Sequence, residues 1–124
     1  MTNQAYRKGQ RFEWQVKTAL QSEAWFVARH AKSALPDLVA AKNGSLLLIE
    51  CKLNGISRGE KARLRKYAEE AGGIPLLATA TKSKIELFLI TQDLGLRPFD
   101  LAEFSKPKVN TSDNGFSDRQ PKLL

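Results

Sequence analysis

An Asn-Gly dipeptide between two short apolar runs constrains the fold of this chain more than any other feature. The dipeptide is Asn43-Gly44, and the runs on either side cover residues 38–41 and 45–51. Both central residues of a type I′ turn need positive φ angles, which Asn and Gly tolerate best, so the pattern predicts a two-residue β-hairpin. The second run is apolar at consecutive positions, which is typical of a central strand covered on both faces.

The predicted turn also sets the register of the hairpin. With two residues in the turn, Asp37 lies directly across from Glu50, with Cβ atoms about 4.5–5.5 Å apart. Because side chains alternate along a strand, Lys52 points to the same face as Glu50. Neighbouring carboxylates repel unless a cation compensates them, and a close pair of hard oxygen ligands suits Mg²⁺ or Mn²⁺. The alternative is an ordinary salt bridge in which Lys52 neutralises one carboxylate.

Periodicity assigns the rest of the chain to two helices and further short strands. Residues 8–23 and 58–71 repeat apolar side chains at helical spacing, and residues 25–29, 75–81 and 85–90 are predicted strands. Ser57 and Glu60 form a capping box for the second helix, and Gly72 supplies its left-handed end. The expected fold class is therefore α/β, a mixed five-stranded sheet flanked by helices in the order αβββαββ. The side chains expected to be buried are Phe12, Val16, Ala19 and Leu20 in the first helix, and Leu64, Tyr67, Ala68 and Ala71 in the second.

Length and composition fit one small domain. We expect residues 1–104 to form that domain and residues 105–124, which hold few apolar side chains, to form a flexible tail. The longest apolar run is four residues and residues 1–8 lack the apolar stretch of a secretory signal. We therefore expect a soluble, cytoplasmic protein without a membrane partner. One Cys and one His exclude a disulfide framework and the common zinc sites.

The positive charge of the chain is confined to its first half. The formal net charge is +7; residues 1–66 carry 13 Lys and Arg against 5 Asp and Glu, whereas residues 67–124 carry 7 against 8. This asymmetry favours a polyanion such as nucleic acid as the partner of the first half. The alternative is a solvated basic face with no partner.

The spacing of the acidic residues matches a nuclease pattern. Pro36-Asp37 is followed, after twelve residues, by Glu50-Cys51-Lys52, as in the PD-(D/E)xK motif of metal-dependent nucleases. Further blocks resemble, in the same order, the archaeal-type Holliday junction resolvases, members of the PD-(D/E)xK superfamily with a restriction-endonuclease-like core. These blocks are Tyr6-Arg7-Lys8-Gly9 with Glu13, Phe26-Val27-Ala28-Arg29 with Ser33, and residues 36–40, 48–52 and 72–78.

The resemblance implies a homodimeric, structure-selective endonuclease that resolves four-way DNA junctions by paired symmetric nicks. It also implies Mg²⁺ as the cofactor, with Mn²⁺ as a substitute. Glu13, Asp37 and Glu50 would be metal-site carboxylates, and Lys52 would orient or polarise the attacking water. Ser33 would complete the catalytic set close to the scissile phosphate. The expected DNA-binding residues are Arg7, Lys8, Arg11, Arg29, Lys32, Arg58 and Lys61.

The chain departs from the family pattern at Trp14, a position that is often basic in the family. Trp14 lies on the side of the helix opposite the apolar stripe, where a tryptophan fits stacking on bases, a dimer contact, or cover by the tail. The segment of residues 53–59 also looks shorter than is usual in the family.

Other functions fit the same residues. One alternative is a nuclease of this fold that acts on flaps, ends or duplex DNA. A second is a non-catalytic module that binds branched DNA, although a pure binder has no need of acids beside phosphates. A third is an RNA-binding or structural basic domain, for which the sequence offers no usual aromatic platform.

Overall fold

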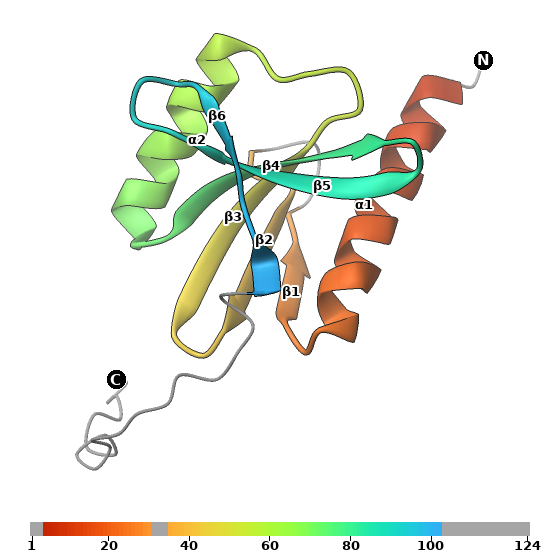
Figure 1. Cartoon of the computed structure of the whole chain (residues 1–124), viewed down its shortest axis with the longest axis horizontal. Coiled ribbons are helices and arrows are strands. Elements are labelled where there is room, and N and C mark those ends of the chain that lie inside the picture. Colours follow the sequence, from red (N-terminus) through yellow and green to blue (C-terminus); the bar gives the residue numbers. More distant parts are fainter. Residues whose placement is uncertain (1–3, 31–34, 103–124) are drawn as a thin grey trace.

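Residues 4–30 and 35–102 are described by the structure, a computed structural model (Figure 1). The expected tail of residues 105–124 lies outside the described residues. None of the described helices combines the length and apolarity needed to cross a membrane. The elements in chain order are α1 (Gln4–Ser22), β1 (Phe26–Arg29), β2 (Leu38–Lys42), β3 (Ser45–Cys51), α2 (Arg58–Ala71), β4 (Ile74–Thr81), β5 (Lys84–Ile90) and β6 (Leu96–Pro98).

The strands form one mixed sheet in sequence order, from β1 to β6. Only β3 and β4 pair in parallel, and α2 is the crossover that connects them; the other neighbours in the sheet are antiparallel. The mixed α/β sheet agrees with the predicted fold class, but it has six strands rather than the expected five. The additional strand, β6, pairs antiparallel with the end of β5. Phe88 lies opposite Pro98, and Ile90 lies opposite Leu96.

The β2–β3 hairpin has the predicted turn and register. Asn43 and Gly44 have φ angles of 52° and 83°, as a type I′ turn requires. Pairing runs from Lys42 opposite Ser45 to Leu38 opposite Ile49. The same register carried one step further places Asp37 across from Glu50, so the hairpin ends in two acidic residues.

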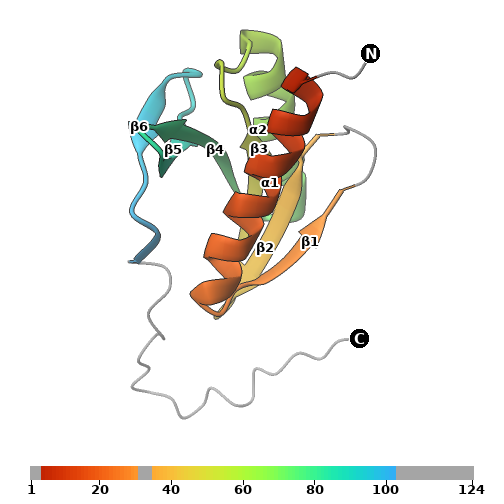
Figure 2. The same ribbon diagram turned by 90° about the vertical axis from the view of Figure 1, so that its right-hand side faces the viewer.

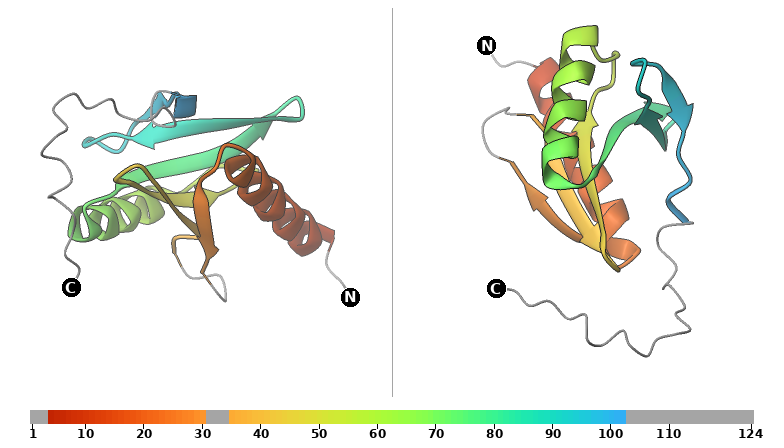
Figure 3. Two further views of the ribbon diagram at one scale, coloured as in Figure 1. Left: turned by 90° about the horizontal axis from the view of Figure 1, so that it is seen from below. Right: turned by 90° about the vertical axis from the view of Figure 1, so that its left-hand side faces the viewer.

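The two helices cover opposite faces of the sheet. Phe12, Val16 and Leu20 of α1 are buried in one cluster with Leu47 and Ile49 of β3. Figure 2 shows α1 in front of the sheet from that side. The right panel of Figure 3 shows α2 in front of the strands from the other side. Because β3 is covered on both faces, its apolar side chains alternate between the two cores, as expected for a central strand.

The second core lies under α2. Leu64 and Ala68 pack with Leu48 and Ile90 there. Three other side chains predicted to be buried in the helices are exposed instead: Ala19, Tyr67 and Ala71. Each lies at the margin of its apolar stripe, where the helix surface turns away from the sheet.

The ends of α2 follow the predicted signals. The Ser57 hydroxyl accepts a hydrogen bond from the Glu60 backbone N–H at 3.1 Å, and Glu60 Oε1 accepts one from the Ser57 N–H at 3.0 Å. This is the reciprocal capping box. The helix stops at Gly72, which has a left-handed φ of 72°. The capping box fixes Glu60 at the start of α2, where its second carboxylate oxygen remains available to another partner.

Candidate active site

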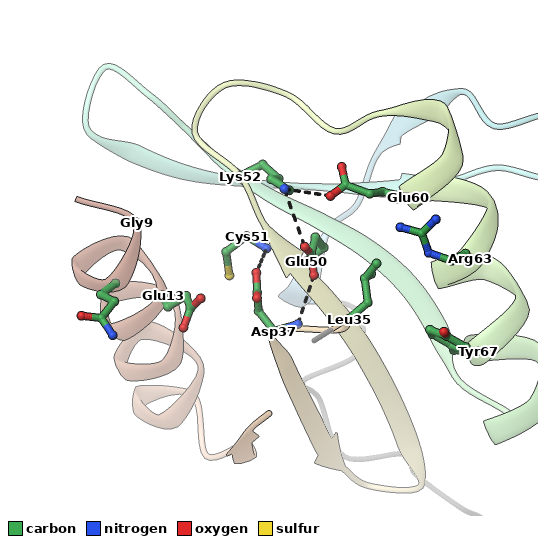
Figure 4. A pocket seen from close by; sticks show the side chains of 11 residues that line it. Gly9, Glu13, Leu35, Asp37, Glu50, Cys51, Lys52, Glu60, Arg63 and Tyr67 are labelled. Atoms are coloured by element: carbon green, nitrogen blue, oxygen red, sulfur yellow. Dashed lines mark hydrogen bonds and ion pairs between the residues drawn. The ribbon is translucent and has the colours of Figure 1, made fainter. Parts of the chain in front are cut away.

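Two buried carboxylates lie side by side at the open end of the β2–β3 hairpin (Figure 4). Asp37 and Glu50 are only 8% and 5% exposed. The Asp37 backbone N–H donates to Glu50 Oε1 at 3.1 Å, and the Cys51 N–H donates to Asp37 Oδ2 at 2.8 Å. Main-chain N–H donors therefore fix both carboxylates in place. They lie just beyond the last backbone pair of the hairpin, Leu38 opposite Ile49.

Burial makes these two carboxylates costly to ionise. Desolvation raises the pKa of Glu50 from 4.5 to about 8, and repulsion by Asp37 adds to the effect, against the attraction of Lys52. Desolvation also raises the pKa of Asp37 from 3.8 to about 6, against the lowering effect of the Cys51 N–H. Repulsion by Glu13 raises the pKa of Asp37 further. The pair thus lacks positive charge, and a cation placed between the two groups would be strongly favoured.

Lys52 supplies one positive charge to this site, but Glu60 holds it more closely than Glu50 does. The Lys52 Nζ lies 2.9 Å from Glu60 Oε2 and 3.9 Å from Glu50 Oε2. The hydrogen bond from Lys52 to Glu60 raises the pKa of the lysine. The pKa of Glu60 is lowered, first by the Ser57 N–H and then by Lys52. Glu60 therefore uses one oxygen to cap α2 and the other to orient the ammonium group.

Glu13 reaches the site from α1. Its Oε1 accepts a hydrogen bond from the Arg29 Nε at 3.1 Å, and the Glu13 side chain is 20% exposed against 48% for Arg29. The repulsion that Glu13 exerts on Asp37 places it within electrostatic reach of the buried pair. Glu13 thereby holds one arginine of β1, Arg29, by an ion pair.

A cavity of about 430 Å³ joins these groups, and it contains side chains from both helices and from the hairpin. Four of the predicted catalytic residues line it, namely Glu13, Asp37, Glu50 and Lys52. Sequence reasoning did not assign its other lining residues to the site. They are Gly9, Gln10, Leu35, Cys51, Glu60, Arg63 and Tyr67.

Cys51 is a further residue in the cavity lining with a side chain that could react, but burial raises the pKa of its thiol. The thiol therefore stays protonated at neutral pH and is a poor nucleophile. The contribution of Cys51 to the site is its backbone N–H, which binds Asp37.

The remaining predicted residues lie around this cavity or outside the described residues. Arg7, Lys8 and Arg11 are exposed on α1, and Arg58 is exposed at the start of α2. Lys61 donates from its Nζ to the Leu94 carbonyl oxygen at 2.6 Å, so it ties α2 to the turn that precedes β6. Two predicted positions, Lys32 and Ser33, lie outside the described residues.

The donor set fits a divalent cation through the Asp37–Glu50 pair. Within residues 4–30 and 35–102, no three Cys, His, Asp or Glu side chains converge as a ready-made metal cluster. Glu13 binds Arg29 and also interacts with Asp37, whose pKa it raises. Two buried carboxylates with raised pKa values nevertheless have the hard oxygen atoms that Mg²⁺ and Mn²⁺ prefer.

Comparison with known proteins assigns this chain to a family. The model of a family described as archaeal Holliday junction resolvase (Hjc) matches residues 4–100. The chain belongs to this resolvase family. The family assignment confirms the resemblance found in the sequence, and the matched residues include the whole described cavity lining.

Two members of the resolvase family show how far the similarity extends. The crossover junction endodeoxyribonuclease Hjc of Methanocaldococcus jannaschii is 37% identical over 78 residues, which span 59% of this chain and 59% of that relative. The solved structure of Hjc from Archaeoglobus fulgidus, a Holliday junction resolvase of an archaeal hyperthermophile, has a TM-score of 0.67 and 21% identity. The match covers 83% of this chain and 99% of that one, and it confirms the fold.

Proposed function

We propose that this resolvase-family protein is a metal-dependent endonuclease that cuts four-way DNA junctions by paired symmetric nicks, as a homodimer. The observation that carries the proposal is the buried Asp37–Glu50 pair with Lys52 beside it, in one cavity at the end of the hairpin. A site that binds DNA and does nothing more gains nothing from two buried acids, because they repel phosphate. Phosphodiester hydrolysis does need such a group of side chains.

Asp37 and Glu50 would hold Mg²⁺, with Mn²⁺ as a substitute, and Glu13 would complete the set directly or through water. When bound, such an ion neutralises charge on the scissile phosphate and lowers the pKa of a coordinated water. The main-chain bonds to Asp37 and Glu50 keep their oxygens oriented before substrate arrives.

Lys52 and Arg29 would act on the phosphate. Glu60 holds the Lys52 ammonium 3.9 Å from Glu50, where it would stabilise the negative charge that develops on the phosphate oxygens. Glu13 binds Arg29 through Nε, which leaves the two Nη atoms of the guanidinium for a phosphate contact. Ser33 would act beside them, and the basic set of Arg7, Lys8, Arg11, Lys32, Arg58 and Lys61 would hold the arms of the junction.

The dimer follows from the symmetry of the substrate. A four-way junction has two-fold symmetry, and a single active site cuts one strand at a time, so paired nicks need two sites related by the same axis. Sedimentation should therefore give a dimer at assay concentration. A protein that nicks both strands symmetrically while it remains a monomer would contradict this part of the proposal.

The deciding experiment maps incisions on a four-way junction labelled in turn on each strand, in Mg²⁺ and in EDTA. We expect symmetric nicks in two opposite strands, only with the metal. Glu50→Ala should abolish the nicks but leave junction binding intact in Ca²⁺. The matched control is Glu70→Ala, which removes an exposed carboxylate of α2 and should cut as well as the unmodified protein.

Each alternative function predicts a different result in this experiment. Preferential cutting of flaps, ends or linear duplex in competition with the junction would indicate another nuclease of this fold. Junction binding without any Mg²⁺-dependent nick would indicate a non-catalytic module. Full activity of the Glu50→Ala protein would remove the carboxylate pair from the mechanism.

A further inference from the structure

Trp14 is the feature of α1 that the proposed chemistry leaves unexplained. Its side chain is 62% exposed, whereas the other tryptophan of the chain, Trp25, is 3% exposed and belongs to the core. An indole exposed to this degree leaves a large apolar surface in water, which is unfavourable unless a ligand or partner covers it.

Two cationic side chains share a hollow with this indole. Trp14 lines a hollow of about 300 Å³ together with Gln10, Glu13, Lys17 and Arg29. Arg29 is held there by its bond to Glu13. A flat aromatic ring beside cationic side chains is the combination that binds single-stranded nucleic acid, since the ring stacks on a base and the cations bind the backbone phosphates.

This hollow adjoins the catalytic cavity, with which it shares lining residues. Gln10 and Glu13 line both, and they lie on the same helix as Trp14. A strand whose phosphate reaches Asp37 and Glu50 would therefore pass along α1, with the neighbouring nucleotide beside the indole. The distance along the strand is short, because the two hollows share the lining residues Gln10 and Glu13.

We infer that Trp14 is a stacking platform for a nucleobase of the DNA strand that lies in the catalytic cavity. The inference rests on the proposed function, which sets the path of the strand. A stacked base would come from the branch point, where base pairs open most readily. Stacking is insensitive to base identity, so the platform recognises an unstacked base rather than a sequence.

Charge argues against a second copy of this chain as the occupant. In a two-fold contact the same patch meets itself, so two Lys17 and two Arg29 side chains would share one interface with only two Glu13 carboxylates from this hollow. Exposed Arg11 on the same helix adds to the like charge. DNA, in contrast, brings the opposite charge to these side chains.

Tryptophan fluorescence tests the inference directly, because only one of the two indoles is accessible. In EDTA, which prevents cleavage, the probes are a four-way junction, an oligothymidine single strand and a fully paired duplex of equal length. We expect the junction and the single strand to quench the emission of the protein, and the duplex to quench it much less. In Trp14→Phe, the remaining emission comes from buried Trp25 and should not change with any probe.

Binding by variants supplies the second measurement. Trp14→Ala should bind the junction about tenfold more weakly, the factor that corresponds to loss of one stacked base, and Trp14→Phe should retain part of the affinity. The matched control is Phe26→Ala, which removes an equally exposed aromatic from β1 that lines neither hollow. Its affinity should equal that of the unmodified protein.

Three results would overturn the inference: no quenching by the junction, unchanged affinity of Trp14→Ala, or an equal loss in Phe26→Ala. Dissociation of a dimer by Trp14→Ala would also overturn it, since the ring would then belong to a contact between copies. Failure of the proposed catalysis would look different. The junction would quench Trp14 emission, but no nick would appear when Mg²⁺ is supplied.

Discussion

The buried acidic pair should make the metal-free protein lose stability as the pH rises. Folding raises the pKa of Glu50 from 4.5 to about 8, so the folded state binds a proton more tightly than the unfolded state. The stability linked to this proton is fully present below pH 4.5 and is lost as the pH rises through 8. At about 1.4 kcal/mol per pH unit, the loss from Glu50 is roughly 3 kcal/mol at neutral pH.

Glu50→Gln removes this cost, because the amide stays neutral and its oxygen still accepts from the Asp37 N–H. In EDTA at pH 7 we expect this variant to be more stable than the unmodified protein by about 3 kcal/mol. The difference should vanish well below pH 4.5, where Glu50 is protonated in both states. Urea unfolding at a series of pH values measures it, with the exposed Glu70→Gln as the control.

A metal ion should reverse the order of stability. Mg²⁺ bound between Asp37 and Glu50 stabilises only the folded state, so it should raise the urea midpoint of the unmodified protein and have little effect on Glu50→Gln. Equal stability of the two proteins at pH 7 in EDTA would refute the reasoning. A difference that grew toward acid pH would refute it as well, since the linkage would then have the opposite sign.

Three further substitutions test the parts of the fold that position the site. Glu60→Gln keeps the capping bond to Ser57 but weakens the 2.9 Å pair with Lys52. Single-turnover nicking should therefore slow several-fold at unchanged urea midpoint, and a lower midpoint would mean that the helix, not the lysine, was disturbed. Gly44→Ala places a Cβ at a φ of 83° and should cost about 1 kcal/mol of unfolding free energy, measured in urea. Leu64→Ala empties a fully buried position under α2 and should cost about 2–5 kcal/mol by the same measurement; a loss below 1 kcal/mol would contradict the packing.

The acidic end of the hairpin could be predicted because it depends on local rules. A two-residue turn at Asn43-Gly44 leaves a single register, and the alternation of side chains then fixes which of them share a face. The observed pairing of Leu38 with Ile49 is the pairing that these rules give. The neighbourhood of Asp37 and Glu50 therefore followed from about fifteen consecutive residues.

Contacts between elements could not be predicted in the same way. The capping box identified Glu60 as a helix-start residue, but its contact with Lys52 depends on how α2 rests on β3. The pair of Glu13 with Arg29 likewise depends on the placement of α1 beside β1. Packing in the two cores sets these placements. The apolar pattern along one helix or strand does not show which residues of another element it will contact.

The sixth strand was missed for a related reason. β6 has only three residues, all exposed, and one of them is Pro98. Proline has no backbone N–H to donate between strands, so within sheets it occurs mainly on edge strands. Local propensity therefore predicts a loop at these residues. Pairing with β5 makes it a strand, and this pairing depends on the tertiary arrangement of the sheet.

The backbone amide of Cys51, not its thiol, holds Asp37 in place, so the evolution of the sequence at this position is not tied to the thiol. Every residue except proline offers the same amide, so the middle position of the Glu50-Cys51-Lys52 triplet is free to drift while the acids on either strand keep their orientation. The side chain at position 51 can therefore evolve with the packing of the neighbouring core while the geometry of the carboxylates is kept.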